Sequence, residues 1–469
     1  MTLKHRSLAL AAPLLVLAGC APQAIPYRPA LEREAELHLY LQPLPQEAQR
    51  LKLHMAQISA VRSDGAELPL LLAFPELNGR DLASAQKRLA SATLPPGSYR
   101  GVSILLDAAS LVREEGTAAL LVPDEPIQVA QDFTLASKKA NALFLSLAPA
   151  NLVTGGFRFT PSFSLQKSRR ELRNLLGFAT SSGANLVTVF NKHSMQVVDV
   201  IATGSGPRGG VIDPRRGWVY IALAGDNAIE AIEVNTGEIL RRLQMNFGDE
   251  PNELALSFDG QLLASANSGS NTASVIDAGS LREIDRVTLS SEPTSVVTHP
   301  SSARAFLFQP LAHTISQVDL ARIDVARTQI FDEMPFRGAM SKDGNTLYAI
   351  TRYSSDLLVI DATTLNLLER IYIGPGAASI AVDLRTELVY VGKKGGSISV
   401  VDPGSLASID DLSIPGDVVF MDLDLDENSL IVATPNLNAV QKIDLTNKSL
   451  RGVLDVGDGG YAVVLMNPR

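Results

Sequence analysis

Short apolar segments that close on Asp or Asn recur along the last two thirds of the chain. The stretch from Leu263 to Leu289 shows the pattern most plainly: an apolar run, a polar turn, a second run ending in Ile276-Asp277, a short turn and a third run. Apolar and polar residues alternate with period two within these runs, which is the pattern of half-buried β-strands, and polar clusters between them are typical of turns. The pattern therefore predicts a repeated antiparallel β-unit.

The repeat can be counted from the Asp or Asn that closes one strand of each unit. Successive members of this turn column are 41 to 44 residues apart. A four-stranded unit of this length cannot bury its apolar faces alone, and such a period is typical of β-propellers. We therefore expect an all-β chain with a seven-bladed β-propeller over residues 175–469. The turn column consists of Asn191, Asn235, Asp277, Asp319, Asp361, Asp402 and Asp444.

The two ends of the repeat region predict how the ring closes. The first unit, 175–202, contains only three apolar runs, and the tail from Tyr461 to Asn467 is a single apolar run without a unit of its own. We expect this tail to be the innermost strand of the first blade. Such pairing removes two free sheet edges and closes the propeller with the C-terminal strand.

Residues 36–166 lack the 42-residue period but alternate in the same strand-like manner. A turn at Leu94-Pro95-Pro96-Gly97 delivers Tyr99 onto an apolar strand, an arrangement common in β-sandwiches. We expect an N-terminal β-sandwich domain here. The charged segment 167–174 has no apolar period and is expected to be the linker between the two domains.

The first residues have the pattern of a secretory signal. A basic start precedes the apolar run from Leu8 to Leu17, and the small residues Ala18 and Gly19 precede Cys20, the single cysteine. The apolar run is too short to span a membrane as a helix. We expect residues 1–19 to be a signal peptide and the proline-rich residues 20–35 to be a tether.

Composition narrows the classes of partner. The formal net charge is −9 and charged residues make up 19% of the chain, so the dense basic surface of a non-specific nucleic-acid binder is not expected. Aromatic residues make up only 5%, which limits stacking platforms for bases or sugars. We expect no nucleic-acid partner and a monomeric protein.

Four resemblances add to these predictions. Leu17-Ala18-Gly19-Cys20 resembles the lipobox of bacterial lipoproteins, which implies that Cys20 is lipidated and that the membrane is a partner through this lipid. Ala21 after the cysteine, by resemblance to the sorting rule of enteric bacteria, implies the outer membrane of a bacterial cell envelope. The first domain resembles uncharacterised envelope β-sandwiches with a Leu-Pro-x-Gly-x-Tyr signature. The repeat resembles the YVTN-type propeller, most fully over Ala264 to Asp277.

The turn column is expected to be structural. Each Asp or Asn ends a strand, and its side chain can accept a backbone N–H two residues ahead. Binding is expected where the blades differ, at the loops around the mouth of the propeller, since a polar, non-repeating funnel is the default binding site. The candidate residues are Arg208, Asn252, Glu253, Arg337, Arg352, Tyr353, Lys393 and Tyr461.

The sequence gives less support to a catalytic function. The haem-attachment motif Cys-x-x-Cys-His is absent, the propeller histidines lie at unrelated blade positions, and no nucleophile triad can be argued from spacing. We expect no catalytic residue, no metal ligand and no cofactor, and favour binding or scaffolding of an envelope protein or polymer. The alternative is a lactonase-like propeller hydrolase with a divalent metal in the funnel, near Asp249, Glu250 and Glu253.

Overall fold

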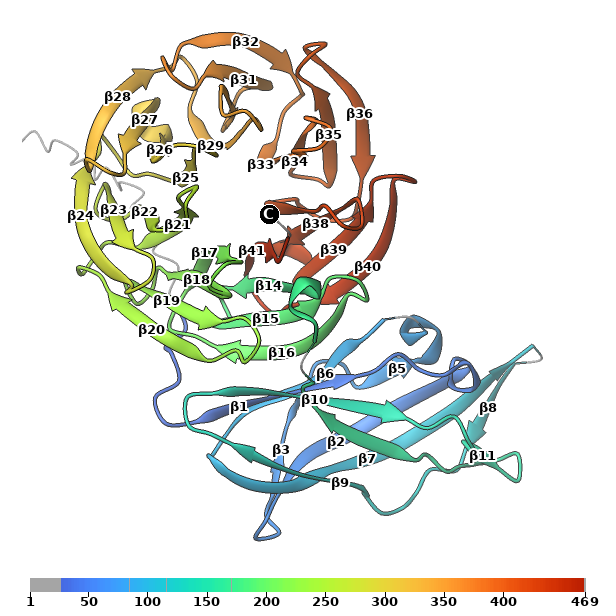
Figure 1. The fold of residues 1–469 in the computed structure, drawn as a ribbon. Helices are drawn as coiled ribbons and strands as arrows, with labels where there is room; N and C mark the ends of the chain where they lie inside the picture. Colours follow the sequence, from blue (N-terminus) through green and yellow to red (C-terminus); the bar gives the residue numbers. More distant parts are fainter. Residues whose placement is uncertain (1–26, 84, 115, 170, 468–469) are drawn as a thin grey trace, which may run out of the picture.

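The computed structural model describes residues 27–83, 85–114, 116–169 and 171–467. Cys20, the signal peptide and most of the tether lie outside these residues. The described chain is all-β, with strands joined by turns and a few short 3-10 helices. Figure 1 shows two parts: a layered part formed by the strands before residue 167, and a ring formed by the strands after it.

The first part consists of two sheets around one apolar core. The first sheet has the order β13-β10-β1-β6-β4, and the second has the order β3-β2-β7-β8, with β5 paired to β2 and β9 paired to β7. Leu37 and Leu39 from the first sheet and Ile58, Val102 and Ile104 from the second are buried in the same cluster. The strands of both sheets are β1 (Ala35–Leu41), β2 (Leu51–Arg62), β3 (Glu67–Pro69), β4 (Leu71–Leu72), β5 (Glu76–Asn78), β6 (Lys87–Leu94), β7 (Gly97–Arg113), β8 (Gly116–Leu120), β9 (Ile127–Leu135), β10 (Ala140–Leu147) and β13 (Phe163–Lys167). A small hairpin, β11 (Val153–Thr154) with β12 (Arg158–Phe159), and the 3-10 turns η1 (Gln46–Ala48) and η2 (Gly79–Leu82) complete this part.

Tyr99 anchors the turn that the sequence pointed to. Its hydroxyl donates to the backbone carbonyl of Pro95 at 2.7 Å, and its ring stacks on Phe133 with centroids 5.2 Å apart. The side chain is buried in the core of the first part. This turn therefore fixes the entry of β7, the longest strand of the sheet.

Seven four-stranded sheets form the ring (Figure 1). In six of them, four consecutive strands run from the centre of the ring to its outside. The turns between first and second strands lie on one side of the ring, for example at Pro214 and Asp259. The six sheets are β17 (Pro207–Asp213), β18 (Trp218–Leu223), β19 (Ala228–Glu233) and β20 (Ile239–Gln244); β21 (Pro251–Leu256), β22 (Leu262–Asn267), β23 (Thr272–Asp277) and β24 (Arg282–Thr288); β25 (Ser295–Thr298), β26 (Arg304–Gln309), β27 (Thr314–Asp319) and β28 (Asp324–Ile330); β29 (Pro335–Met340), β30 (Thr346–Thr351), β31 (Asp356–Asp361) and β32 (Leu367–Tyr372); β33 (Ala377–Val382), β34 (Val389–Lys393), β35 (Ser397–Asp402) and β36 (Ala407–Ser413); and β37 (Phe420–Asp424), β38 (Ser429–Thr434), β39 (Ala439–Asp444) and β40 (Ser449–Asp455).

The remaining sheet joins both ends of the repeat region. It has the order β16-β15-β14-β41, in which β14 (Leu176–Ser181), β15 (Leu186–Asn191) and β16 (Gln196–Ala202) are followed in space by the C-terminal strand β41 (Gly460–Leu465). β41 pairs antiparallel with β14, with Ala179 opposite Val463. The tail is thus the innermost strand of the first sheet, as the pattern predicted, and it gives β14 a partner on both sides.

The turn column is correct at six of its seven positions. Asn191, Asp277, Asp319, Asp361, Asp402 and Asp444 each accept a backbone N–H two or three residues ahead, at 2.7 to 3.2 Å. The assignment of Asn235 is wrong. β19 ends at Glu233, whose carboxylate accepts from the backbone N–H of Thr236 at 2.6 Å. The longer Glu side chain takes the role of Asp here, and Val234 extends the apolar run and displaces the count by two residues.

The first part packs against the outer strands of the ring. Tyr40 and Phe144 lie in one buried cluster with Met195, Val197 and Val200, next to the outer strand β16. At its centre the Gln86 amide pairs with the backbone of Val197, accepting its N–H at 2.7 Å and donating to its carbonyl at 3.2 Å. Gln86 therefore satisfies backbone groups on the free edge of β16, which would otherwise remain open to pairing with another chain. The segment between the two parts contains the 3-10 turn η3 (Arg173–Leu175).

Candidate functional site

A hollow of about 1110 Å³ opens at the centre of the ring, on the side where loops enter the innermost strands. Six of the eight residues predicted from the sequence line it: Arg208, Asn252, Arg337, Arg352, Tyr353 and Tyr461. They come from four of the seven sheets, because the loops on this side converge on the central axis. We call this hollow the funnel.

The floor of the funnel is an ion pair across the ring. The guanidinium of Arg337, on β29, contacts the carboxylate of Glu253, on β21, 84 residues away. Arg337 also donates to the backbone carbonyls of Val419 at 2.7 Å and Ala378 at 3.1 Å, and its charge lies 5.0 Å from the ring centre of Phe420. Burial lowers the pKa of Arg337, but the Glu253 carboxylate outweighs this, and the pKa is raised overall. The seventh predicted residue, Glu253, therefore lies beneath the funnel, neutralised by Arg337.

A chain of hydrogen bonds runs up the wall from this floor. The hydroxyl of Tyr461 and the guanidinium of Arg208 both donate to the side-chain oxygen of Asn252, at 2.9 and 3.0 Å, and the Asn252 amide donates to the carbonyl of Thr294 at 2.6 Å. Burial raises the pKa of Tyr461, so this hydroxyl remains a donor. Arg208 continues the chain to the hydroxyl of Tyr27 and lies over its ring.

The rim of the funnel carries side chains that are not neutralised. Arg352, Tyr353 and Lys394 are exposed, with Tyr353 84% exposed, and across the described residues no carboxylate lies within salt-bridge distance of either cation. Glu250 and Glu292 also line the funnel, and neither has a cationic partner among the described residues. The funnel thus has an acidic wall, on loops leading into β21 and β25, and next to it a basic wall, on loops that follow β30 and β34.

Lys393, the eighth predicted residue, does not line the funnel. Its ammonium donates to the carbonyl of Ile373 and lies 4.0 Å from Asp411, between two sheets. Lys393 is the last residue of β34, and Lys394, the first residue of the loop that follows, lines the funnel. The prediction of Lys393 is therefore corrected to its neighbour.

Two other residues at the funnel were missed. Glu292 lines it and lies in a polar turn without a distinctive pattern, and Tyr27, in the segment predicted to be a tether, contacts Arg208 on its wall. No local signal distinguishes them, because their position depends on which loops converge.

The acidic residues considered for a metal point in different directions. Asp249 is buried against Arg286, at 3.0 Å, and Glu253 is held by Arg337, so of the three only Glu250 lines the funnel. Among the described residues no group of three or more His, Cys, Asp or Glu side chains could hold a metal ion. A divalent ion would have to displace two arginines to gather these three carboxylates.

Below the floor, the inner strand β37 meets the closing strand. The Asp422 carboxylate accepts from the backbone N–H of Leu465 at 2.9 Å, and burial raises the pKa of Asp422 to about 6. Nearby, the buried ammonium of Lys192 donates to Asp424 at 2.8 Å and to the carbonyl of Met466 at 3.0 Å. These polar contacts attach β41 to the last sheet of the ring as well as to the first.

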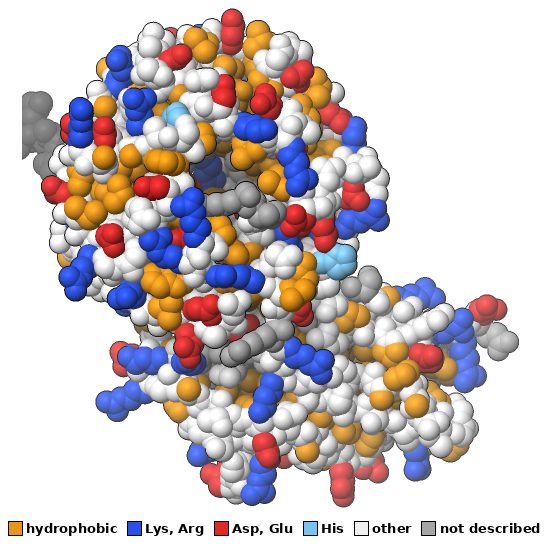
Figure 2. Space-filling model, in the orientation of Figure 1, with side chains coloured by type: hydrophobic (Ala, Val, Ile, Leu, Met, Phe, Trp, Pro, Cys, Tyr) orange, Lys and Arg blue, Asp and Glu red, His pale blue; other side chains and the backbone are white. Residues whose placement is uncertain are grey.

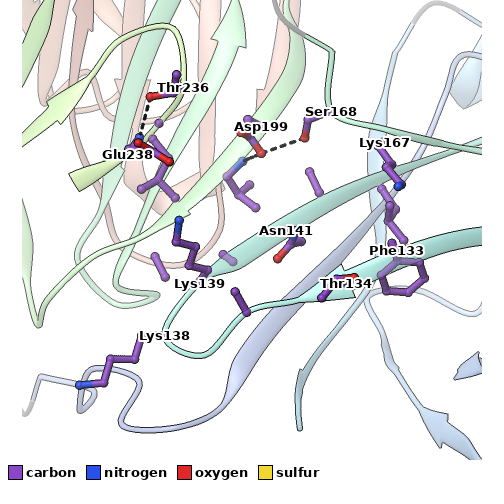
Figure 3. A pocket seen from close by; sticks show the side chains of 18 of the residues that line it. Phe133, Thr134, Lys138, Lys139, Asn141, Lys167, Ser168, Asp199, Thr236 and Glu238 are labelled. Atoms are coloured by element: carbon purple, nitrogen blue, oxygen red, sulfur yellow. Dashed lines mark hydrogen bonds between the residues drawn. The ribbon is translucent and has the colours of Figure 1, made fainter. Parts of the chain in front are cut away.

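A second hollow, of about 730 Å³, lies between the first part and the ring (Figure 3). Asp199 on β16 accepts from the Ser168 hydroxyl at 2.9 Å, and burial raises the pKa of this carboxyl. Lys139 and Asn141 lie on the opposite wall, and Glu238 on the ring side (Figure 3). Fewer hydrogen bonds join its lining residues to one another than join those of the funnel.

The outer surface shows no concentration of one charge on the face drawn in Figure 2. Lys and Arg side chains are interspersed with Asp and Glu around the ring. That face does not offer the continuous basic strip that a phosphate backbone requires. No helix in the described ranges has the length and apolar character to cross a membrane.

Comparison with known proteins identifies the fold. No protein-family model matches the chain, and no curated protein matches its sequence. Among solved structures, a functionally unknown protein from Desulfotomaculum acetoxidans DSM 771 matches with a TM-score of 0.58 and 12% identity, over 63% of this chain and 99% of that one. Hydrazine synthase from Kuenenia stuttgartiensis matches with a TM-score of 0.51 and 16% identity, over 55% of this chain and 88% of that one. At such low identity the similarity concerns the fold alone: this is an all-β chain with a propeller-like ring.

Proposed function

We propose that this protein is a lipid-anchored binding protein of the bacterial cell envelope. In this proposal the first part is a β-sandwich, and the ring is a seven-bladed propeller of the YVTN type. The lipid is carried by Cys20, which anchors the chain in the outer membrane, and the funnel holds a segment of an envelope protein or polymer. The protein acts by binding and performs no chemistry.

Binding is supported by the difference between the two levels of the funnel: the charges of the floor neutralise each other, whereas the charged side chains of the rim have no partner among the described residues. Arg337 and Glu253 neutralise each other, so they offer no net charge to a ligand. Arg352 and Lys394 on one wall and Glu250 and Glu292 on the other remain available. Charges of opposite sign on two parts of the same wall orient a polar segment that itself carries both signs, and the exposed Tyr353 adds apolar contact area.

The hydrolase alternative has weaker support from the same geometry. A metal-dependent lactonase needs two or three oxygen ligands that converge on one ion. Here Asp249 and Glu253 are each engaged by an arginine, and Glu250 lines the funnel apart from them. Metal analysis of the purified protein, followed by a lactone hydrolysis assay with the metal added back, tests this alternative directly.

Charge reversal at the rim tests the binding proposal. Arg352→Glu combined with Lys394→Glu should reduce recovery of a cross-linked envelope partner about tenfold at low salt, because like charges then face each other. The matched control is Lys342→Glu, an exposed lysine in the turn between β29 and β30, on the other side of the ring. A partner whose recovery falls equally in both variants does not bind in the funnel.

The anchor is tested separately. Labelled palmitate should enter the wild-type protein, and Cys20→Ser should release the protein from the membrane fraction. A wild-type protein that remains soluble would contradict the lipid anchor while leaving the funnel proposal to its own test.

A further inference from the structure

The last residues of the tether are seated on the rim of the funnel. The ring of Tyr27 lies against Gly206 and Gly225, so closely that a Cβ added to either glycine would come within 2.6 or 2.9 Å of it. The backbone carbonyl of Arg28 accepts from the Asn185 amide at 2.7 Å and from the Ser205 hydroxyl at 2.8 Å. Side chain and backbone together hold this segment between the first two sheets of the ring.

The seat is also connected to the wall of the funnel. The guanidinium of Arg208 donates to the hydroxyl of Tyr27, lies over its ring and donates to Asn252. Burial raises the pKa of Tyr27, so the hydroxyl stays protonated. Arg208 is thus shared by the seat and by the wall of the funnel. The seat lies on the funnel side of the ring, because Gly206 precedes the innermost strand β17 and Gly225 lies between β18 and β19.

We propose that this seat turns the mouth of the funnel toward the membrane that holds the lipid. The inference rests on the proposed lipidation of Cys20. Cys20 precedes Tyr27 by seven residues, and an extended chain spans at most ~3.6 Å per residue, so the lipid lies within ~25 Å of the seat. The turns on the other face of the ring lie one strand length farther away, which is ~20 Å for six residues.

This orientation selects the kind of partner. Arg337 reaches across the channel to Glu253 and to the carbonyls of Ala378 and Val419, so the mouth is the wide way into the funnel. A mouth that faces the bilayer receives a segment that projects from the bilayer. The partner that fits is the exposed polar segment of a protein embedded in the same membrane, with charges of both signs to match the two walls.

The orientation can be measured on the full-length lipidated chain in phosphatidylcholine vesicles that contain a headgroup-labelled acceptor lipid. The thiol of Cys20 is occupied by lipid, so one introduced cysteine can carry a donor dye. Phe247→Cys, at a 99% exposed position in the loop before β21, reports the funnel side, and Ser301→Cys, in the turn between β25 and β26, reports the other side. Energy transfer to the acceptor should be clearly stronger from position 247 than from position 301.

The seat is tested by a matched pair of variants. Tyr27→Phe keeps the ring between the two glycines and should preserve the difference in energy transfer. Tyr27→Ser removes the ring and should make transfer from the two positions more nearly equal. Equal or reversed transfer in the wild type would overturn the orientation, and an unchanged difference in Tyr27→Ser would overturn the role of the seat.

Proteolysis separates failure of the seat from failure of the anchor. Elastase, which cleaves after small residues, should cleave after Ala30 at least tenfold more slowly in the wild type and in Tyr27→Phe than in Tyr27→Ser, because the hydrogen bonds to the Arg28 carbonyl hold the neighbouring backbone in the seated form. If the protein does not associate with vesicles but shows this protection, the lipid anchor is wrong and the seat is right. If cleavage is equally fast in all three proteins, the seat does not exist.

Discussion

Replacing Arg337 should destabilise the protein more than any other single change at the funnel. In Arg337→Met, the Glu253 side chain, only 9% exposed, loses its cation, and the carbonyls of Val419 and Ala378 lose their donor. The contact of the guanidinium with the Phe420 ring is lost as well. Removing one partner of a buried ion pair costs about 3–5 kcal/mol, because the other charge stays buried and unpaired.

Urea denaturation provides the measurement. The single tryptophan, Trp218, lies on β18 within the ring, so its fluorescence reports unfolding of the ring. A loss of about 3 kcal/mol, with a slope near 3 kcal/mol/M, moves the midpoint down by about 1 M. Arg352→Met is the matched control, since Arg352 is exposed and its loss should change stability by no more than ~0.5 kcal/mol.

A second substitution tests the cause. Glu253→Gln in the Arg337→Met background removes the unpaired charge and should recover at least ~1 kcal/mol of the lost stability. If the double variant is as unstable as Arg337→Met alone, or if Arg337→Met costs less than ~1 kcal/mol, the ion pair is not what holds the floor together.

Three further predictions concern the ring. The pKa of Asp422 rises from 3.8 to about 6 in the folded protein, so the contribution of this carboxyl to stability is greatest below pH 4 and is lost as the pH rises through about 6. Asp422→Asn should remove on the order of 2 kcal/mol of this pH dependence, measured by urea titration at a series of pH values. An unchanged pH profile would show that Asp422 is not the group that titrates. Asp277→Ala should cost ~1 kcal/mol, by analogy with loss of a helix cap, whereas Asn235→Ala should cost almost nothing, because Glu233 fills its place; equal costs would refute the corrected turn column. Deletion from Gly457 onward removes β41 and exposes β14, so the truncated protein should aggregate or lose cooperative melting; melting like the full-length protein would show that the closing strand is dispensable.

Much of the architecture is local in origin and could be predicted from the sequence. Period-two alternation and turn residues placed the strands of the ring, because a strand with one buried face must show that alternation wherever it lies. The orphan tail Tyr461 to Asn467 predicted β41 by simple counting, since a three-stranded unit lacks one inner strand. Where a local signal was altered, as by Val234 next to Glu233, the count failed by two residues.

The site depended on contacts that only the tertiary structure brings about. The sequence predicted Arg337 and Glu253 as two separate charges at the rim. In the ring they form an ion pair across 84 residues of sequence and make up the floor of the funnel. Lys393 and Lys394 are neighbours of the same residue type. Only the position at which β34 ends decides that Lys394, and not Lys393, lines the funnel. Tyr27 had no strand pattern. Its ring packs against two glycines, Gly206 before β17 and Gly225 between β18 and β19. Closing a ring brings loops from distant repeats to one axis, and the pairing of charges there is set by that geometry, which local sequence does not encode.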